Sequence, residues 1–141
     1  MILLDTNVVS ELMKSAPAPG VLAWVDAVPG AALFVSAVTQ AEILYGLALL
    51  PAGKRRDELA GAARVVFETY FRRRILPFDS DAAEAFAELA AERRQSGRPI
   101  TQADAQIAAI ARSRGAALAT RNVADFEGCG IDVVNPWNLV S

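Results

Sequence analysis

The sequence predicts an α/β fold, a helix-rich three-layer α/β/α sandwich around a short central parallel sheet. Short apolar runs bounded by turn-forming residues indicate buried strands, and they alternate along the chain with longer segments of helical periodicity. Strands separated by helices pair in parallel and are covered on both faces. The composition agrees, because 53% of the residues are hydrophobic and 21% are charged, as in a protein that forms a core.

The length of 141 residues fits one domain that spans residues 1–141. Cys129 is the only cysteine, so no internal disulfide is possible. No apolar run approaches the ~20 residues that a membrane-spanning helix needs. Asp5 interrupts the first apolar stretch, and no basic segment precedes it, unlike in a signal peptide. We therefore expect a soluble, cytoplasmic protein.

The first strand is expected over Ile2–Leu4, where three large apolar residues lead into turn formers. A short helix should follow over Asn7–Lys14, with Thr6 or Asn7 as its N-cap. Pro17 and Pro19 should break that helix.

Val21–Val28 carries apolar residues at helical spacing and predicts a second helix, which a Pro-Gly pair ends. Leu33–Val35 is a second buried strand. A helix should then run from Thr39 to about Leu50, with Val38, Glu42, Tyr45 and Leu49 along the face toward the core.

A long, partly basic helix is expected from about Lys54 to Arg74. Ile75–Phe78 should be extended, since Pro77 keeps the residue before it out of the helical region. A helix capped by Asp79 should follow to about Gln95. We also expect the aromatic side chains in this part of the chain to be core residues: Tyr45, Phe67, Tyr70 and Phe71.

The last helix should begin at Thr101 and end at Arg114, because Gly115 is a typical helix stop. Within it, Asp104 shares the core-facing stripe with Ile107 and its neighbours. Two short strands complete the sheet, at Ala117–Ala119 and Asp132–Val134.

The sequence contains no histidine, which excludes Ser-His-Asp and Cys-His catalysis and zinc sites built on histidine. The net charge of −2 argues against a generally basic nucleic-acid coat. Chemistry would have to come from carboxylates, hydroxyls, amides, lysine or arginine.

Three acids are placed to meet at one edge of the sheet. Asp5 follows a strand, and Glu42 and Asp104 lie near the starts of helices whose N-terminal ends should lie near the carboxyl ends of the strands, where ligands bind in open α/β sheets. Each acid has a simpler explanation as a helix cap. Asp5 could cap the first helix, Thr39 to Glu42 has the pattern of a capping box, and Thr101 to Asp104 is a near copy of it.

Taken together, three carboxylates on one rim would repel one another and would either raise their pKa values or hold a cation. Oxygen ligands without histidine or cysteine select hard cations such as Mg²⁺ or Mn²⁺, which suit phosphodiester hydrolysis. Asn122 leaves the strand at Ala117–Ala119 on the same rim and is a neutral oxygen donor, or else a turn residue.

These residues resemble those of PIN-domain ribonucleases, specifically the VapC/FitB-like toxins of type II toxin–antitoxin pairs. The resemblance covers the whole chain. It rests on the following segments: Leu4-Asp5-Thr6-Asn7, Ser36 to Glu42 ahead of Gly46, Asp104 to Ala109, Ala119-Thr120-Arg121-Asn122 and Asn135-Pro136-Trp137.

The resemblance implies a Mg²⁺- or Mn²⁺-dependent endoribonuclease. By it, Asp5 and Asp104 would be the principal metal ligands and Glu42 the third acid, with support from Thr6, Asn7 and Thr120. Many members have a fourth acid where Asn122 stands, which puts a second metal in doubt. The implied partners are RNA, a second copy of the chain, and a small antitoxin whose C-terminal segment covers the acidic pocket, in a larger complex.

Three basic stretches could contact RNA phosphates or could simply be solvated: Lys54-Arg55-Arg56, Arg72-Arg73-Arg74, and Arg93-Arg94 with Arg98. Asp125 is expected to be a surface acid. The competing hypothesis is a non-catalytic acidic pocket that captures a basic partner peptide. A haloacid-dehalogenase-type phosphatase is excluded, because Asn7 stands where its second aspartate would be needed.

Overall fold

The computed structural model describes residues 1–138 and contains the predicted parallel sheet. Five strands pair in the order β3-β2-β1-β4-β5, and every pair is parallel. The central strand is therefore the first one in the sequence. The strands are β1 (Ile2–Leu4), β2 (Leu33–Ser36), β3 (Ile75–Leu76), β4 (Ala117–Ala119) and β5 (Val133–Val134).

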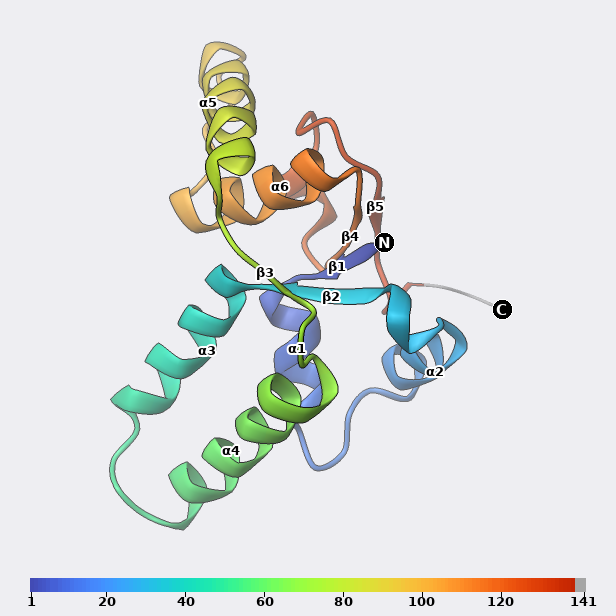
Figure 1. The fold of residues 1–141 in the computed structure, drawn as a ribbon, viewed down its shortest axis with the longest axis vertical. Coiled ribbons are helices and arrows are strands. Elements are labelled where there is room, and N and C mark those ends of the chain that lie inside the picture. Colours follow the sequence, from blue (N-terminus) through green and yellow to red (C-terminus); the bar gives the residue numbers. More distant parts are fainter. Residues whose placement is uncertain (139–141) are drawn as a thin grey trace.

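Helices cover both faces of this sheet, which confirms the three-layer sandwich (Figure 1). The helices are α1 (Thr6–Leu12), α2 (Pro19–Ala27), α3 (Ala37–Leu49), α4 (Lys54–Arg64), α5 (Ser80–Gln95) and α6 (Gln102–Arg114). Three short segments complete the fold: η1 (Gly30–Ala32), η2 (Val65–Tyr70) and η3 (Val123–Phe126). No helix of the described residues is both long and apolar enough to cross a membrane.

The core has two parts, one on each face of the sheet. Leu3 packs with α5 and α6, whereas Leu4 packs with the helices α1 to α4. Successive strand residues point to opposite faces, so both side chains are fully buried. This double burial explains why the first strand is a continuous apolar run and not an alternating one.

The first two helices begin earlier than the sequence analysis placed them. Asp5, and neither Thr6 nor Asn7, is the N-cap of α1, because its carboxylate accepts from the Thr6 N–H. Pro19 is the first residue of α2 and not only a break before it. Proline suits that position, where its missing N–H would have no helical partner.

The helix expected over Lys54–Arg74 is shorter. Regular α-helix ends at Arg64, and a wider π-helical segment, η2, carries the chain to Tyr70. The guanidinium of Arg74 donates to the carbonyls of Gly30, Leu33 and Tyr70, so this arginine links the end of η2 to η1 and to the start of β2.

The prediction for the core face of α3 was wrong. Thr39 and Ile43 are its buried residues, whereas Tyr45 is 67% and Leu49 66% exposed. Tyr70 is also exposed, at 44%, while Phe67 and Phe71 are core residues as predicted.

The later elements agree closely with the prediction. Asp79 caps α5 through the Ala82 N–H, and the Thr101 hydroxyl caps α6 through the Asp104 N–H. Gly115 follows α6 with φ of 63°, the left-handed conformation that glycine adopts without strain.

Candidate functional site

The predicted acids lie at the carboxyl edge of the sheet, at the point where the strand order reverses. After β1 the chain adds β2 and β3 on one side, and later β4 and β5 on the other. Such a reversal leaves a crevice between the two neighbouring strand ends, where open α/β sheets bind ligands. Asp5 follows β1 and Thr120 follows β4, so these two residues border the crevice.

The Asp5 carboxylate is buried, with 4% of the residue exposed, and is held by three donors. Its Oδ1 accepts from the Thr6 N–H at 2.8 Å. Its Oδ2 accepts from the Thr120 hydroxyl at 2.7 Å and from Asn7 Nδ2 at 3.0 Å. A carboxylate offers about four lone-pair positions, two on each oxygen. The position left free is therefore on Oδ1, where a cation could bind.

Asn7 and Thr120 connect this carboxylate to the neighbouring loop. Thr120 Oγ1 accepts from Asn7 Nδ2 at 3.3 Å and from the Asn122 N–H at 3.1 Å. Asn7 Oδ1 accepts from the Arg121 N–H at 3.2 Å. The predicted supporting residues thus form one hydrogen-bonded network around Asp5.

Glu42 is not a helix cap, contrary to the capping-box alternative. The N-cap of α3 is Ser36, whose hydroxyl accepts from the Thr39 N–H at 3.0 Å. Glu42 lies in the next turn, exposed to solvent, and its Oε1 accepts from the Thr6 hydroxyl at 2.7 Å. The Thr6 hydroxyl also lies 3.0 Å from Thr39 Oγ1. Since it has one proton and gives that to Glu42, Thr39 is the donor in that second bond.

Asp104 is the third acid of the rim, near the start of α6 and half-buried. Burial raises its pKa above the usual value, hydrogen bonding with Thr101 opposes the rise, and the charges of Asp125 and Glu42 add to it. Asp5 behaves alike: burial raises its pKa, hydrogen bonds from Thr120 and Thr6 oppose this, and the charges of Asp104 and Glu42 raise it further. The three predicted acids therefore share one electrostatic environment.

Within residues 1–138, no three acidic, cysteine or histidine side chains converge closely enough to enclose a metal ion. A smaller set of ligands still suits Mg²⁺, which is commonly held by one or two carboxylates and completes its shell with waters and phosphate oxygens. Asp5, with its free position on Oδ1, and Asp104 could supply two such carboxylates.

Asn122 contributes its backbone to the site. Its N–H binds Thr120 Oγ1 at 3.1 Å, and it precedes η3 without a side-chain capping bond. Asp125, in η3, is exposed as predicted, yet its charge raises the pKa of Asp104. This loop therefore places the negative charge of Asp125 near Asp104, three residues beyond the position where the resemblance implies a fourth acid.

Arg93 is a residue whose role the sequence analysis missed. It was considered for RNA contact, but it is 7% exposed. Its guanidinium donates to the carbonyls of Arg98 at 2.7 Å, Asp125 at 2.8 Å and Glu127 at 3.0 Å. A buried cation needs such partners, and these bonds fasten the η3 loop beside the acidic rim. No local sequence signal distinguishes it from its exposed neighbour Arg94.

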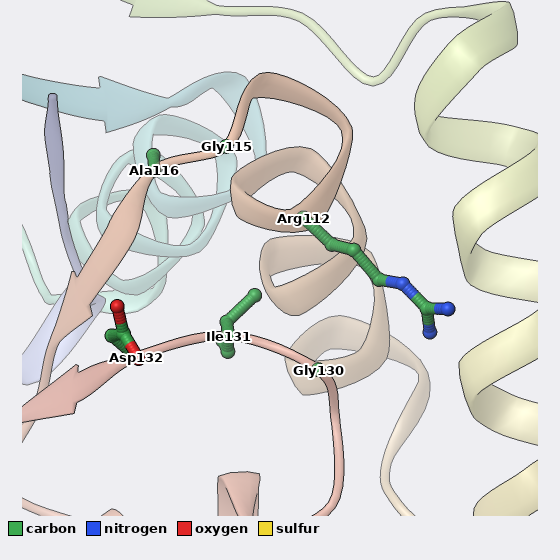
Figure 2. Close-up of a pocket in the computed structure, with 6 residues that line it drawn as sticks. All are labelled: Arg112, Gly115, Ala116, Gly130, Ile131 and Asp132. Carbon is green, nitrogen blue, oxygen red and sulfur yellow. The ribbon is translucent and has the colours of Figure 1, made fainter.

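A separate hollow of about 400 Å³ lies at the opposite, amino edge of the sheet (Figure 2). It lies beside Gly115 and Ala116, just before β4, and includes Asp132, just before β5. Figure 2 shows the Arg112 side chain extending away from Asp132, and its guanidinium lies 3.3 Å from Glu88. None of the predicted site residues borders this hollow.

Comparisons with known proteins give consistent matches over nearly the whole chain. A family model described as PIN domain matches residues 2–127. VapC ribonuclease Y4jK of Sinorhizobium fredii is 46% identical over 137 residues, which are 97% of this chain and 98% of that protein. Toxin FitB of Neisseria gonorrhoeae is 38% identical over 138 residues, which are 98% of this chain and 99% of that protein.

Solved structures agree with this result. FitAB bound to an IR36 DNA fragment matches with a TM-score of 0.92 at 38% identity, covering 100% of this chain and 99% of that chain. A toxin–antitoxin complex from Klebsiella pneumoniae matches with a TM-score of 0.70 at 25% identity, covering 99% and 100%.

Proposed function

Because this chain belongs to the PIN-domain family, we propose that it is the toxin of a toxin–antitoxin pair and an endoribonuclease that hydrolyses RNA phosphodiester bonds at the rim of Asp5, Glu42 and Asp104. The observation that carries the proposal is the fixed Asp5 carboxylate, with three donors and one open acceptor position beside two other acids.

In this proposal, Asp5 and Asp104 would hold a Mg²⁺ or Mn²⁺ ion, which would supply charge stabilisation at the transferring phosphate and activate water for attack. Thr120 and Asn7 keep the Asp5 carboxylate from rotating, because both of their donors bind Oδ2. The buried Asp5 needs such donors, since desolvation favours its protonated form, which is a poor cation ligand.

Glu42 has a different role, because it is exposed and bound through only one oxygen. The Thr6 hydroxyl binds Oε1, which leaves Oε2 free to accept a proton from the water that attacks the phosphate. Thr39 completes this arrangement by binding Thr6 from the buried side.

Substitutions at the two metal-binding aspartates test the proposal. Asp5→Asn and Asp104→Asn each remove one negative charge with little change in volume, so we expect folded proteins that have lost RNA cleavage and most of their Mn²⁺ affinity. Asp26→Asn, an exposed aspartate on α2, is the matched control and should retain both properties. Circular dichroism, calorimetric Mn²⁺ titration and cleavage of labelled RNA provide the readouts. Folded Asp5→Asn or Asp104→Asn proteins that still cleave RNA at the wild-type rate would refute the proposed function.

The partner in this proposal is an antitoxin whose tail covers the rim, as in the resemblance. A groove of about 310 Å³ leads away from Thr6 and Glu42 and has an apolar wall of Ile43, Leu47 and Leu59. An apolar segment with a basic residue at one end would complement it. The exposed side chains of Leu44, Tyr45 and Leu49 on α3 offer further apolar surface for the antitoxin or for a second copy of the chain in a homodimer.

The competing function, an acidic pocket that captures a basic peptide without catalysis, draws support from the loose spacing of the acids and from the neutral Asn122. Calorimetric titration of the wild type with Mn²⁺ at neutral pH discriminates between the two. Absence of binding, together with absence of RNA cleavage, would favour the binding module.

A further inference from the structure

Arg121 and Trp137 form a pair beside the acidic rim that the proposed chemistry does not use. Arg121 lies between Thr120 and Asn122, and its guanidinium carbon lies 5.2 Å from the centroid of the Trp137 ring. A guanidinium at this distance is attracted to the face of the indole. Arg121 is exposed and Trp137 is half-buried against the core, so the ring supports the cation from the protein side.

Asn135 fixes both members of the pair through one side chain. Its Nδ2 donates to the backbone carbonyl of Arg121 at 3.4 Å, and its Oδ1 accepts from the backbone N–H of Trp137 at 2.9 Å. The Arg121 N–H in turn binds Asn7 Oδ1, and Asn7 binds Asp5. The backbone of Arg121 is therefore tied to the Asp5 network on one side and to Trp137 on the other.

Arg121 makes no ion pair with the residues that the structure describes, unlike five of the other basic residues. Among residues 1–138, the five ion pairs engage Lys14, Lys54, Arg98, Arg112 and Arg114, and none engages Arg121. The charge of Arg121 makes a small contribution to lowering the pKa of Glu11, but this carboxylate is already bound by Lys14 at 3.0 Å and by the Ala18 N–H. Two residues of the basic stretches considered for RNA contact, Arg74 and Arg93, are already engaged by backbone carbonyls.

Position separates Arg121 from two other exposed arginines, Arg72 and Arg55. Arg72 precedes β3 and so lies at the amino edge of the sheet, away from the acids. Arg55 lies beside Met13 and Ser15, past the far end of α1. An RNA chain that approaches three carboxylates needs a nearby cation to offset the repulsion between like charges.

We propose that Arg121, held in place by Trp137 and Asn135, binds a phosphate of the RNA strand next to the one that is cleaved. The inference rests on the proposed ribonuclease function. The guanidinium presents several donors in a rigid fork that matches phosphate oxygens, and stacking on Trp137 leaves less side-chain freedom to be lost on binding. The contact reads the backbone and not the base, so it contributes affinity and register without sequence preference.

Binding of a labelled single-stranded RNA oligonucleotide tests this inference, measured by fluorescence anisotropy at several salt concentrations. Asp104→Asn is the parent protein, since it should not cleave the probe. Adding Arg121→Gln should weaken binding about fivefold at low salt and reduce the slope of log affinity against log salt by about 0.7, the value for one phosphate contact on a single strand. Adding Arg72→Gln is the matched control and should leave the slope unchanged.

A second variant separates positioning from charge. Trp137→Leu keeps Arg121 but removes the ring beneath it, so we expect weaker RNA binding with an unchanged salt slope. Because Trp137 also packs against the core, the folding of the Trp137→Leu protein is checked by circular dichroism. If that protein unfolds, the Arg121→Gln result alone determines whether Arg121 contacts a phosphate.

The outcomes are distinct for the two proposals. A parent that shows no salt-dependent RNA binding overturns both the ribonuclease function and this inference. A parent that binds RNA, with an Arg121→Gln slope equal to its own, overturns only the inference and assigns the pair to packing or to contact with a protein. Mn²⁺ affinity should be the same with Arg121 or glutamine at this position in otherwise wild-type protein.

Discussion

Replacing Thr120 by valine tests how the site keeps Asp5 ionised. Thr120 is fully buried, and its hydroxyl donates to Asp5 Oδ2 at 2.7 Å. Valine has nearly the same shape, so no cavity forms. The substitution removes this hydrogen bond and the two longer ones that Thr120 Oγ1 accepts from Asn7 Nδ2 and the Asn122 N–H. A bond to a charged group contributes about 1.5–3 kcal/mol. We expect a loss of roughly 2 kcal/mol in the free energy of unfolding at neutral pH, or about 8 °C in Tm.

The same substitution should change the pH dependence of cleavage. Burial raises the pKa of Asp5, and the Thr120 hydrogen bond is the largest effect that opposes the rise. Without that bond the protonated form is favoured further. If cleavage requires the ionised carboxylate, the acid limb of the pH–rate profile moves to higher pH. The stability deficit should shrink as the pH falls, because a protonated Asp5 no longer needs the bond.

Thr120→Ser is the matched control. It keeps the hydroxyl and loses one methyl group, so it should cost about 1 kcal/mol of stability while its acid limb stays at the wild-type position. Guanidinium-chloride denaturation and cleavage of labelled RNA between pH 5 and pH 8 measure both quantities. A valine variant with the wild-type acid limb and Mn²⁺ affinity would show that this bond does not control the ionisation of Asp5.

Four further outcomes follow from individual contacts. Arg93→Met leaves three carbonyls without their donor and should cost about 3 kcal/mol by chemical denaturation; Arg93→Lys should recover part of that loss. Gly115→Ala should cost about 1 kcal/mol because its φ of 63° is unfavourable for alanine, and an unchanged Tm would contradict this. Ser36→Ala removes the N-cap of α3 and should cost about 1 kcal/mol, whereas Ser36→Thr should largely retain it. The pKa values of Asp5 and Asp104 are raised, so their contribution to stability is fully present below the unfolded-state pKa and is lost as the pH rises through the folded-state pKa. Chemical denaturation at several pH values should show this loss of stability. Asp104→Asn should make the loss smaller.

Helix orientation shows where sequence reasoning fails. The residues of α3 are apolar on nearly every side, so no single stripe marks the face that packs. The structure buries Thr39 and Ile43 and leaves Tyr45 and Leu49 in solvent. The threonine is polar, but its hydroxyl finds Thr6, a residue 33 positions away. A hydropathy pattern cannot register a partner that the fold brings from elsewhere.

Helix caps and buried charges fail for related reasons. Thr39 and Glu42 have the spacing of a capping box, yet Ser36 takes the cap position, so Glu42 is available to Thr6. Arg93 and Arg94 are adjacent and chemically identical, but only Arg93 points inward, where carbonyls 32 and 34 residues away receive its donors. Which arginine is buried depends on the path of the η3 loop, which the local sequence does not encode.

The sequence by itself determined the parallel α/β class and the expectation that Asp5, Glu42 and Asp104 meet at one edge. It could do so because strand periodicity and chain order place all the strand ends of a parallel sheet on the same side. Only the tertiary structure decided three contacts: which lone pair of Asp5 stays open, that the Thr6 hydroxyl donates to Glu42, and that the Arg121 guanidinium lies over the Trp137 ring. These are contacts between residues far apart in the chain, and their geometry is set by packing at the level of single atoms, which residue types and spacings do not specify.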